Sequence, residues 1–579
     1  APNLYVDALS FEEDTDEDGI LNPGEQMKLY VDIGNSYDYG ADSITMVIST
    51  ENQNLYFIDN TIQFYNIIGE GQVGSSDTDW FELYALPSIE LGNVECNINI
   101  TTSDTENPYE IDIPIQILVS LDQKGFPIDD IVIKSSPIIA DLYGNNFKNI
   151  VFGSDDGNVY GYMIDGIEMF GFPYATGDNV RSSPAVADLD KNNSMELIIG
   201  SHDGSLSILS GFGLQLETHQ VNGSINGSPA AVDLDQDGDL EVVFTSYNGS
   251  TGDVHAIHHN GSTFYGFPVY LNEKMVGGAA AGDLDGDGYP EIVVCTDDDN
   301  VYAIKKNGSI MDGFPFTSTD RFFNAPTLVD LDFDGDLEIV VGNRRGTLQV
   351  LHHDGTEMAS YEVGDDIRGG ISVADMNNDG SYELLVTSYE DMIHVWNPID
   401  GAELEGWPVD MGSNSLTEPV TADLDNDGDL EVVAATRSGM AYVFHHDATP
   451  YNNFPTSLGG NVESSPAIGD IDGDGDFELV FGTTQGLKVI DIKEDMGERV
   501  SWKLHRGNLE RTGSLGMTLV SNDFEEGLTP SEFYVSANYP NPFNPSTMID
   551  IETVEAGDLL VSVFDAKGRM VNNLVNSYL

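Results

Sequence analysis

The sequence is poor in cysteine, in basic residues and in long apolar runs. Only Cys96 and Cys295 occur in 579 residues, so a disulfide framework is excluded, and Cys295 in the apolar run EIVVCT is expected to be a buried thiol. Basic residues number 22 against 99 acidic ones, for a net charge of -77. No basic stretch could neutralise phosphate, so we expect no nucleic-acid partner. The apolar runs fall far short of the ~20 residues that span a bilayer, which predicts no membrane insertion.

The shortage of cysteine does not fix the compartment, because a chain of this size needs no disulfides even outside the cell. The chain opens at APNLYVDALS, without an initiator Met or a charged-then-apolar leader. This is expected of a mature N-terminus from which a signal peptide has been removed. Trimming of a longer chain would look the same.

An internal repeat is the strongest pattern in the sequence. An SSPAVAD-like run, an acidic loop, an apolar LEIVVGS-like run and a DGxVYxI run recur every 45 to 50 residues. Nothing in the repeat has helical periodicity, and three or four short β-like runs per unit are typical of a propeller blade. Eight copies predict eight blades, and the first acidic residues of their loops are Asp141, Asp188, Asp233, Asp283, Asp330, Asp375, Asp423 and Asp470.

A GFP-like element predicts how the ring closes. It ends several repeats and is missing from the eighth, yet a copy at Gly125 to Pro127 precedes the first repeat. We therefore expect residues 123–133 to supply the outer strand of the last blade, which leaves no unpaired edge at the seam. The alternative, an open solenoid, would need polar capping repeats.

The predicted fold class is all-β. Residues 1–121 read as strands and are expected to form an immunoglobulin-like β-sandwich. Residues 122–513 are predicted to form an eight-bladed β-propeller, 514–530 a linker, and 531–579 a partial C-terminal β-sandwich.

The acidic loop has the pattern of a metal site. It reads D-x-D-x-D-G-x-x-E in repeats three, four, five, seven and eight. Oxygen donors at positions 1, 3 and 5, a glycine at 6, a carbonyl at 7 and a glutamate at 9 wrap one hard cation, and such a ligand set favours Ca²⁺. The alternative, solvated turns, does not explain five full copies at fixed spacing. The predicted ligands in these repeats are Asp233, Asp235, Asp237, Asp239, Glu241; Asp283, Asp285, Asp287, Tyr289, Glu291; Asp330, Asp332, Asp334, Asp336, Glu338; Asp423, Asp425, Asp427, Asp429, Glu431; and Asp470, Asp472, Asp474, Asp476, Glu478.

Three repeats depart from the pattern. Repeat six and repeat two keep enough oxygen donors for a weaker site. Repeat one, DLYGNNFKN, keeps only Asp141 and Asn145, so we predict that it binds no ion or binds one poorly. The ligands predicted in repeat two are Asp188, Asp190, Asn192, Ser194 and Glu196, and those in repeat six are Asp375, Asn377, Asp379, Ser381 and Glu383.

A further calcium loop is predicted before the repeats. The stretch DTDEDGILNPGE fits the twelve-residue calcium loop, although its flanks are strand-like. The alternative is an acidic hairpin without metal. About seven ions in the propeller and one here are therefore expected, and the ligands of this last site would be Asp14, Asp16, Asp18, the Ile20 carbonyl, Asn22 and Glu25.

Other motifs point away from catalysis. The pairs His258-His259, His352-His353 and His445-His446 hold equivalent places in three non-adjacent repeats, which predicts a role in a blade turn. The sequence contains no G-x-S-x-G, H-E-x-x-H, P-loop or C-x-x-C motif, and the carboxylates with a pattern are assigned to calcium. We therefore predict that the chain is not an enzyme.

Two resemblances add to this interpretation. SSPAVADLDxDGxxEIVVGS resembles the FG-GAP or VCBS-type calcium-binding propeller repeat, over residues 134–512. YPNPFNPST with VSVFDAKGRMV resembles the C-terminal sorting domain of type IX secretion, cut short after Leu579. This second resemblance implies export to the surface or exterior of a Gram-negative bacterium.

The sequence thus predicts a secreted, calcium-stabilised, non-catalytic surface protein for adhesion or extracellular structure. Its expected partners are Ca²⁺ and either copies of itself, through strand addition, or surface glycans and proteins. The alternative is a polysaccharide lyase or a carbohydrate-binding propeller, because some eight-bladed calcium propellers are polysaccharide lyases.

Overall fold

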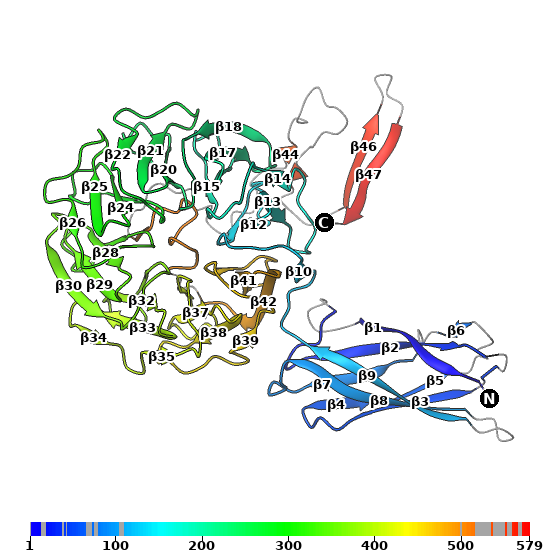
Figure 1. Cartoon of the computed structure of the whole chain (residues 1–579). Coiled ribbons are helices and arrows are strands. Elements are labelled where there is room, and N and C mark those ends of the chain that lie inside the picture. Colours follow the sequence, from blue (N-terminus) through cyan, green and yellow to red (C-terminus); the bar gives the residue numbers. More distant parts are fainter. Residues whose placement is uncertain are drawn as a thin grey trace. The chain divides into compact units, whose positions relative to one another are not determined.

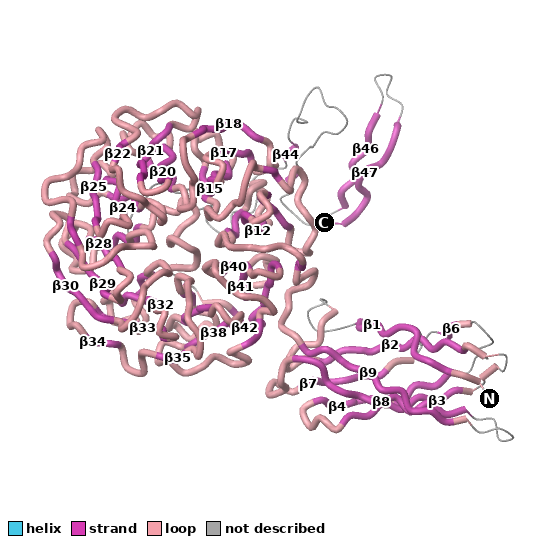
Figure 2. Tube along the Cα trace, viewed as in Figure 1, coloured by secondary structure: helices cyan, strands magenta, loops and turns pink. Residues whose placement is uncertain are grey.

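A computed structural model describes residues 2–12, 19–37, 40–41, 43–64, 72–74, 79–102, 109–497, 499 and 501–515, and strand residues 534–535, 551–552, 558–564 and 570–578. These residues form strands and loops without a helix, which confirms the all-β prediction (Figure 2). Consequently, no helix in the described part could cross a membrane. The chain divides into two compact units, residues 1–517 and 518–579.

The first part of the chain forms two antiparallel sheets. In β2, burial alternates along the strand, so one face of its sheet turns to a core that contains Met27, Leu29 and Phe81. Cys96 is buried in the same core as a free thiol. One sheet holds β1 (Leu4–Glu12), β2 (Gln26–Asn35), β7 (Phe81–Ala85), β4 (Leu55–Asp59) and β6 (Val73–Gly74); the other holds β5 (Thr61–Phe64), β3 (Ile44–Thr50), β8 (Gly92–Thr102) and β9 (Glu110–Val119).

Eight further sheets lie around a common centre as the blades of a propeller (Figure 1). We number these blades in the order of the sequence repeats. Blades 1 to 4 contain β11 (Ile138–Ala140), β12 (Asn149–Gly153), β13 (Asn158–Tyr162) and β14 (Tyr174–Ala175); β15 (Ala185–Ala187), β16 (Glu196–Gly200), β17 (Ser205–Ser210) and β18 (Gln215–Gln220); β19 (Ala230–Val232), β20 (Glu241–Asn248), β21 (Thr251–Ile257) and β22 (Val269–Tyr270); and β23 (Ala280–Gly282), β24 (Glu291–Cys295), β25 (Asn300–Ile304) and β26 (Phe316–Thr317).

Blades 5 to 8 repeat this order of strands, with small additions. Blade 5 gains a parallel strand beside its first strand, and blade 6 has two short outer strands. These blades contain β27 (Thr327–Val329), β28 (Glu338–Gly342), β29 (Thr347–Leu351), β30 (Glu357–Glu362) and β43 (Ser514–Leu515); β31 (Ser372–Ala374), β32 (Glu383–Thr387), β33 (Met392–Asn397), β34 (Ala402–Glu403) and β35 (Val409–Asp410); β36 (Val420–Ala422), β37 (Glu431–Ala435), β38 (Met440–Phe444) and β39 (Thr456–Ser457); and β40 (Ala467–Gly469), β41 (Asp476–Gly482), β42 (Gly486–Asp495) and β10 (Ile128–Asp129).

Blade 8 is completed by a strand from the beginning of the propeller. β10 pairs with β42, with Ile128 opposite Leu487, which confirms the closure predicted from the GFP element. One core cluster joins Ile150 of blade 1, Leu197 of blade 2 and Val480 of blade 8 across this seam. Because each blade packs against two others, both faces of its second strand are buried, as in β12 and β28.

The second unit has two short pairs of strands within its described residues. β44 (Tyr534–Val535) pairs with β45 (Ile551–Glu552), and β46 (Asp558–Phe564) pairs with β47 (Met570–Tyr578). The YPNPFNPST motif lies outside the described residues, so the resemblance to a sorting domain stays a prediction.

Residues 501–515, which we call the central segment, run through the middle of the ring (orange in Figure 1). Backbone N–H groups of the first strands of six blades donate to carbonyl oxygens of this segment. The pairs are Val186 to Leu509, Ala231 to Glu510, Ala281 to Thr512, Leu328 to Gly513, Thr421 to Trp502 and Ile468 to Lys503, at 2.8 to 3.0 Å. The segment therefore satisfies inner strand edges that would otherwise face the centre without a partner.

Two buried arginines of the central segment bind carbonyl oxygens of several blades. Arg511 donates from Nε to the Pro184 oxygen at 2.9 Å and from Nη2 to the Pro137 oxygen at 3.1 Å. Arg506 donates from Nη1 to the Pro326 oxygen at 2.6 Å and from Nη2 to the Ala279 oxygen at 3.3 Å. A planar guanidinium with five donors can hold several carbonyl groups at once, so these two side chains tie blades 1, 2, 4 and 5 to one short segment.

Glu418 supplies the buried negative charge that this cationic segment needs. It is fully buried, and its carboxylate accepts hydrogen bonds from His505 Nδ1 at 2.6 Å and from the indole N–H of Trp502. Burial alone would raise the pKa of Glu418, but His505, Arg506 and Trp502 hold it below its ordinary value. Glu418 is therefore an ionised partner of the central segment.

Replacing Glu418 with glutamine tests this role. Glu418→Gln leaves buried cationic groups without their counter-charge, and breaking a buried pair costs about 3–5 kcal/mol. We expect a lower urea midpoint and a lower melting temperature. Glu405→Gln, at an exposed position, is the matched control and should leave both unchanged. Equal stability of the two variants would contradict the role given to Glu418.

Candidate metal centres

The acidic loops join the first strand of each blade to the second. In blade 3 the loop lies between β19 and β20, and the Oδ2 atom of Asp233 accepts the N–H of Gly238 at 3.0 Å. The same bond from position 6 to position 1 recurs in blades 2, 4, 5, 6 and 7, at 2.8 to 3.2 Å. Gly238 has φ +102, in the left-handed region that favours glycine, which explains the glycine at position 6. The acidic loops of blades 2 to 7 thus adopt the same turn conformation.

The glutamate at position 9 fastens each loop to the start of the second strand. In blade 3, Glu241 Oε2 accepts the N–H of Leu234, the residue at position 2, at 3.0 Å. The same bond occurs in all seven blades that have this glutamate, at 2.5 to 3.1 Å. Each of these glutamates is buried. One carboxylate oxygen is therefore committed to the loop, and Oε1 remains for another partner.

The remaining carboxylate oxygens converge. Ligand atoms of three acidic side chains lie within 4.8 Å of one another in blades 2, 3 and 4, and two carboxylates and a histidine do so in blades 5 and 7. Carboxylates at this distance repel one another unless a cation lies between them. The groups are Asp188, Asp190 and Glu196; Asp233, Asp235 and Glu241; Asp283, Asp285 and Asp287; Asp332, Glu338 and His352; and Asp425, Glu431 and His445.

The pKa values of the position-9 glutamates are raised, because ionising a buried carboxylate beside other carboxylates is unfavourable without a cation. Burial, followed by repulsion from the loop aspartates, raises the pKa of Glu241 to about 8 and that of Glu431 to about 8. The same causes raise the pKa of Glu196 and Glu291 to about 7. A divalent cation would reverse this shift, because it favours the ionised form. Acidic clusters that can hold metal ions are thus present, and the choice and number of ions remain proposals.

Sequence reasoning missed a partner of this glutamate at the end of the third strand in blades 3, 5, 6 and 7. His258 Nδ1 lies 2.9 Å from Glu241 Oε1, and His352 and His445 make the equivalent contact with Glu338 and Glu431, at 3.3 and 3.2 Å. In blade 6 the partner is Asn397, which donates to Glu383 Oε1 at 3.0 Å. The first histidine of each pair follows the glutamate by 14 or 17 residues, and this recurrence was the signal for the contact.

The second histidine of each pair also contacts its own acidic loop. His259 Nδ1 lies 3.3 Å from Asp239 Oδ2, His353 lies 3.1 Å from Asp336, and His446 lies 3.2 Å from Asp429. The pairs therefore lie in a blade turn, and in addition they hold positions 7 and 9 of the loop. Their rings lie beside loop carboxylates, where they could orient metal ligands.

Blade 8 has an additional carboxylate at this place. Asp491 lies opposite Glu478 in the register of β41 and β42, and it is fully buried. Its Oδ1 atom accepts no hydrogen bond from the described residues, and its Oδ2 atom lies 2.5 Å from Lys493 Nζ. Burial and mutual repulsion raise the pKa of Asp476, Glu478 and Asp491. A cation in this loop would offset the repulsion among these three carboxylates.

In blade 1, hydrogen bonds within the loop satisfy the carboxylate of Asp141. The Asp141 carboxylate accepts three N–H groups, from Tyr143, Asn145 and Asn146, at 3.2, 3.1 and 2.6 Å. Asn149 stands where the other blades have glutamate, and its Oδ1 atom accepts the N–H of Leu142 at 3.3 Å. A neutral amide therefore fastens this loop, which supports the prediction of a weak or absent site in blade 1.

The N-terminal loop is described in part. Asp14, Asp16 and Asp18 lie outside the described residues. Asn22 and Glu25 are buried, and the Asn22 N–H donates to Glu25 Oε2 at 3.0 Å. The Asn22 Oδ1 atom is buried and accepts no hydrogen bond from the described residues, so it fits the role of a ligand. The calcium site remains a prediction.

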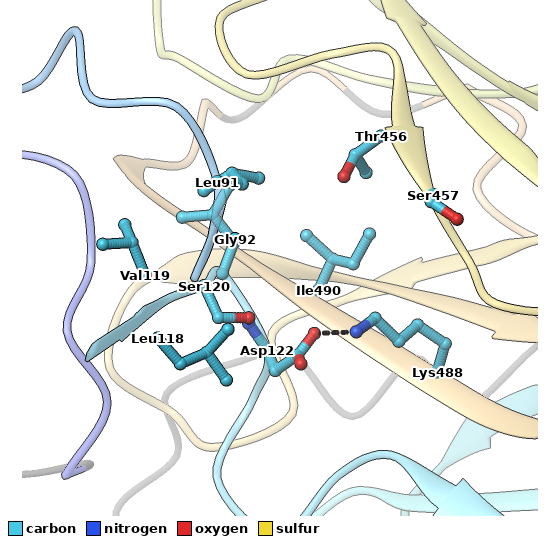
Figure 3. Close-up of a pocket in the computed structure, with 11 residues that line it drawn as sticks. Leu91, Gly92, Leu118, Val119, Ser120, Asp122, Thr456, Ser457, Lys488 and Ile490 are labelled. Atoms are coloured by element: carbon cyan, nitrogen blue, oxygen red, sulfur yellow. Dashed lines mark hydrogen bonds and ion pairs between the residues drawn. The ribbon is translucent and has the colours of Figure 1, made fainter. Parts of the chain in front are cut away.

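A cavity of about 240 Å³ lies in the first unit, near the end of β9 (Figure 3). Its lining includes Leu91, Leu118 and Ile490, and its charged side chains, Asp122 and Lys488, form an ion pair with each other. These paired charges do not form a convergent polar site, so the acidic loops remain the better candidate.

Comparison with protein families identifies the repeat. Residues 233–294, 283–341, 330–386, 375–434 and 423–481 match the FG-GAP-like repeat. The chain therefore carries five such repeats, which lie within blades 3 to 8. No curated protein matches the chain.

Several solved structures are similar to the chain at low identity. The V. cholerae biofilm matrix protein Bap1 is 13% identical with a TM-score of 0.47, and the match covers 68% of this chain and 94% of Bap1. The rhamnogalacturonan lyase PL11 of Bacillus licheniformis is 14% identical with a TM-score of 0.46, over 87% of this chain and 95% of the lyase. A europium-containing methanol dehydrogenase is 12% identical with a TM-score of 0.46, over 63% and 92%. A likeness at this level says nothing about function.

Removal of calcium should destabilise the protein. An ion that binds only the folded state stabilises it by about 2.7 kcal/mol per site when its concentration is 100 times Kd. We expect EDTA to lower the melting temperature strongly and added CaCl₂ to restore it, as measured by calorimetry. Asp235→Asn should weaken this response, whereas Asp141→Asn in blade 1 should lower stability equally with and without calcium. A melting curve that EDTA leaves unchanged would refute the metal sites.

The pH dependence of stability should differ between the calcium-free and calcium-loaded protein. Glu241 and Glu431, with pKa values raised to about 8, bind more protons in the folded than in the unfolded state. Stability of the calcium-free protein should therefore fall as the pH rises from about 6.5 to about 8. With excess calcium the melting temperature should hold or rise over this range, because deprotonated carboxylates bind the ion better. A melting temperature that rises with pH in EDTA would contradict the raised pKa values of Glu241 and Glu431.

Proposed function

We propose that the chain is a calcium-stabilised, non-catalytic protein that acts outside the cell, in adhesion or in an extracellular structure. The observation that carries this proposal is the set of seven acidic loops with a buried glutamate, of which those of blades 2, 3, 4, 5 and 7 bring three ligand atoms within 4.8 Å of one another. In this proposal, the aspartates at positions 1, 3 and 5 and the glutamate at position 9 hold Ca²⁺, and the ion supplies the charge that fixes the loop. Loops of the extracellular type bind calcium with Kd of about 10⁻⁴ to 10⁻³ M, so they would be filled outside the cell.

The filled centre of the propeller supports a scaffold role. Trp502, Arg506 and Arg511 are buried along the ring centre, where other propellers could admit a ligand. Binding would then use the loops at the ends of the strands or the other parts of the chain. Rigid loops on a closed ring suit recognition of a partner, because little order has to be gained on binding.

Self-assembly through strand addition is part of this proposal. Among the described residues, β46 and β47 pair only with each other, as a two-stranded sheet. Such a hairpin has two edges that can accept a strand from another copy. Export through the type IX route and a place on the surface of a Gram-negative cell stay proposals based on the sequence motif.

The alternative function is a polysaccharide lyase or a carbohydrate-binding propeller. One observation favours the carbohydrate-binding form, namely a cluster of arginines and aromatic rings at the ends of the strands opposite the acidic loops. Lyase activity would show itself as the release of unsaturated products from a uronate polymer.

Sedimentation of the full chain tests the proposed function. We expect the calcium-loaded protein to form species of higher mass as its concentration rises, and EDTA to reverse this. Val561→Pro should abolish assembly, because proline breaks the pairing of β46 with β47, while the melting temperature of the first unit stays unchanged. A strictly monomeric protein in calcium would contradict self-assembly, and turnover of a polysaccharide would contradict the non-catalytic role.

A further inference from the structure

Positive charge is concentrated in a few places of this acidic chain. The sequence has ten arginines, and six of them lie in turns at one end of the blades: Arg181, Arg321, Arg344, Arg345, Arg368 and Arg437. Arg344, Arg345 and Arg437 lie between second and third strands, and the other three lie just before first strands. Since the acidic loops join first to second strands, these arginines lie at the opposite ends of the strands from the acidic loops.

Four of these arginines surround two aromatic rings, which together we call the arginine–aromatic cluster. The guanidinium carbons of Arg321, Arg344 and Arg368 lie 5.6, 5.8 and 5.4 Å from the centre of the Phe323 ring. Arg368 also lies 4.6 Å from the Tyr389 ring, and Arg437 Nη1 donates to the Tyr389 hydroxyl at 3.1 Å. The residues of the cluster therefore come from the connection between blades 4 and 5 and from turns of blades 5 to 7.

The acidic partners of the cluster lie deeper than its arginines. Asp366 is 8% exposed and pairs with Arg368 at 2.8 Å and with Arg344 at 3.6 Å, whereas these arginines are 34% and 39% exposed. Arg321 is 38% exposed and pairs with Asp297, which is 23% exposed, at 3.3 Å. The carboxylates thus hold the guanidinium groups from below, and the arginines face outward.

The arginines of the cluster have N–H donors that their acidic partners leave unused. Asp366 and Asp297 contact one nitrogen of each arginine: Nε of Arg344 and of Arg368, and Nη1 of Arg321. A guanidinium has five N–H donors, so several remain for a ligand. Asp298, Asp299 and Asp320 also lie near Arg321, so the unused donors of the cluster lie in acidic surroundings.

We propose that the arginine–aromatic cluster binds a polysaccharide whose sugar units carry carboxylates. A planar guanidinium pairs with a carboxylate through two parallel hydrogen bonds, and the C–H face of a sugar ring packs on an aromatic ring. Phe323 and Tyr389 supply rings beside the arginines, so one sugar unit can use both kinds of contact. Repeated units would reach several arginines around the ring. This inference rests on the proposed binding function, for which it names the ligand.

Calorimetric titration with galacturonate hexamer tests the proposal, with the full chain in a buffer that contains calcium. We expect binding that weakens with added NaCl, and a loss of at least tenfold in affinity for the methyl-esterified hexamer, which lacks the charges. Arg368→Gln and Phe323→Leu should each weaken binding about tenfold. Arg345→Gln is the matched control, since Arg345 is exposed on the same turn as Arg344, and should leave affinity unchanged. Melting curves verify that each variant is folded.

Two outcomes would overturn the proposal. One is no binding of the hexamer by the folded, calcium-loaded protein. The other is equal binding of oligoglutamate, which would assign the cluster to an acidic protein segment. Failure of the proposed function is distinguishable, because sedimentation in calcium tests assembly without any sugar. If assembly persists and the hexamer does not bind, this inference alone fails.

Discussion

The structure depends on the burial of one glutamate carboxylate at the start of the second strand in seven of the eight blades. Glu241 shows the constraint: one oxygen is fastened to the loop by the N–H of Leu234, and the other faces aspartates and His258. An ionised carboxylate in that position is unfavourable without a cation. The register of the second strand, the shape of the loop and the acidic composition all follow from this arrangement. Blade 1, with Asn149 in place of the glutamate, shows that the turn itself can form without the charge.

The central segment also buries charged groups, but here the buried groups are cations. Arg506 and Arg511 place two buried cations among carbonyl oxygens of the blades, and Glu418 balances them. β10 closes the ring at its circumference, while the central segment closes it at the axis. Both closures use chain from outside the repeats, so the first and last parts of the propeller are fixed to each other. This leaves the ends of the strands as the surfaces on which a partner can bind.

The features that could be predicted from the sequence are those that a local pattern of residues determines. The period of the repeat predicted the blades, the displaced GFP element predicted β10 as the outer strand of blade 8, and the alternation of acids predicted the clusters at Asp233 and its equivalents. It did not predict contacts between residues far apart. Arg511 and Pro137 are 374 residues apart, and no pattern in the stretch around Trp502 indicates that it runs through the centre of the ring. The arginine–aromatic cluster was missed for the same reason, because Arg321, Arg344 and Arg368 belong to different turns.

The direct test of this account is the number of calcium ions that the folded protein binds, measured by equilibrium dialysis with metal analysis and repeated on Glu241→Gln. The account predicts about eight ions per chain at saturation, seven in the propeller and one in the N-terminal loop, with about one ion fewer in the variant. It assigns none of these ions to blade 1, where Asn149 stands in place of the glutamate. Binding of no calcium at millimolar concentration, or an unchanged number in Glu241→Gln, would contradict it.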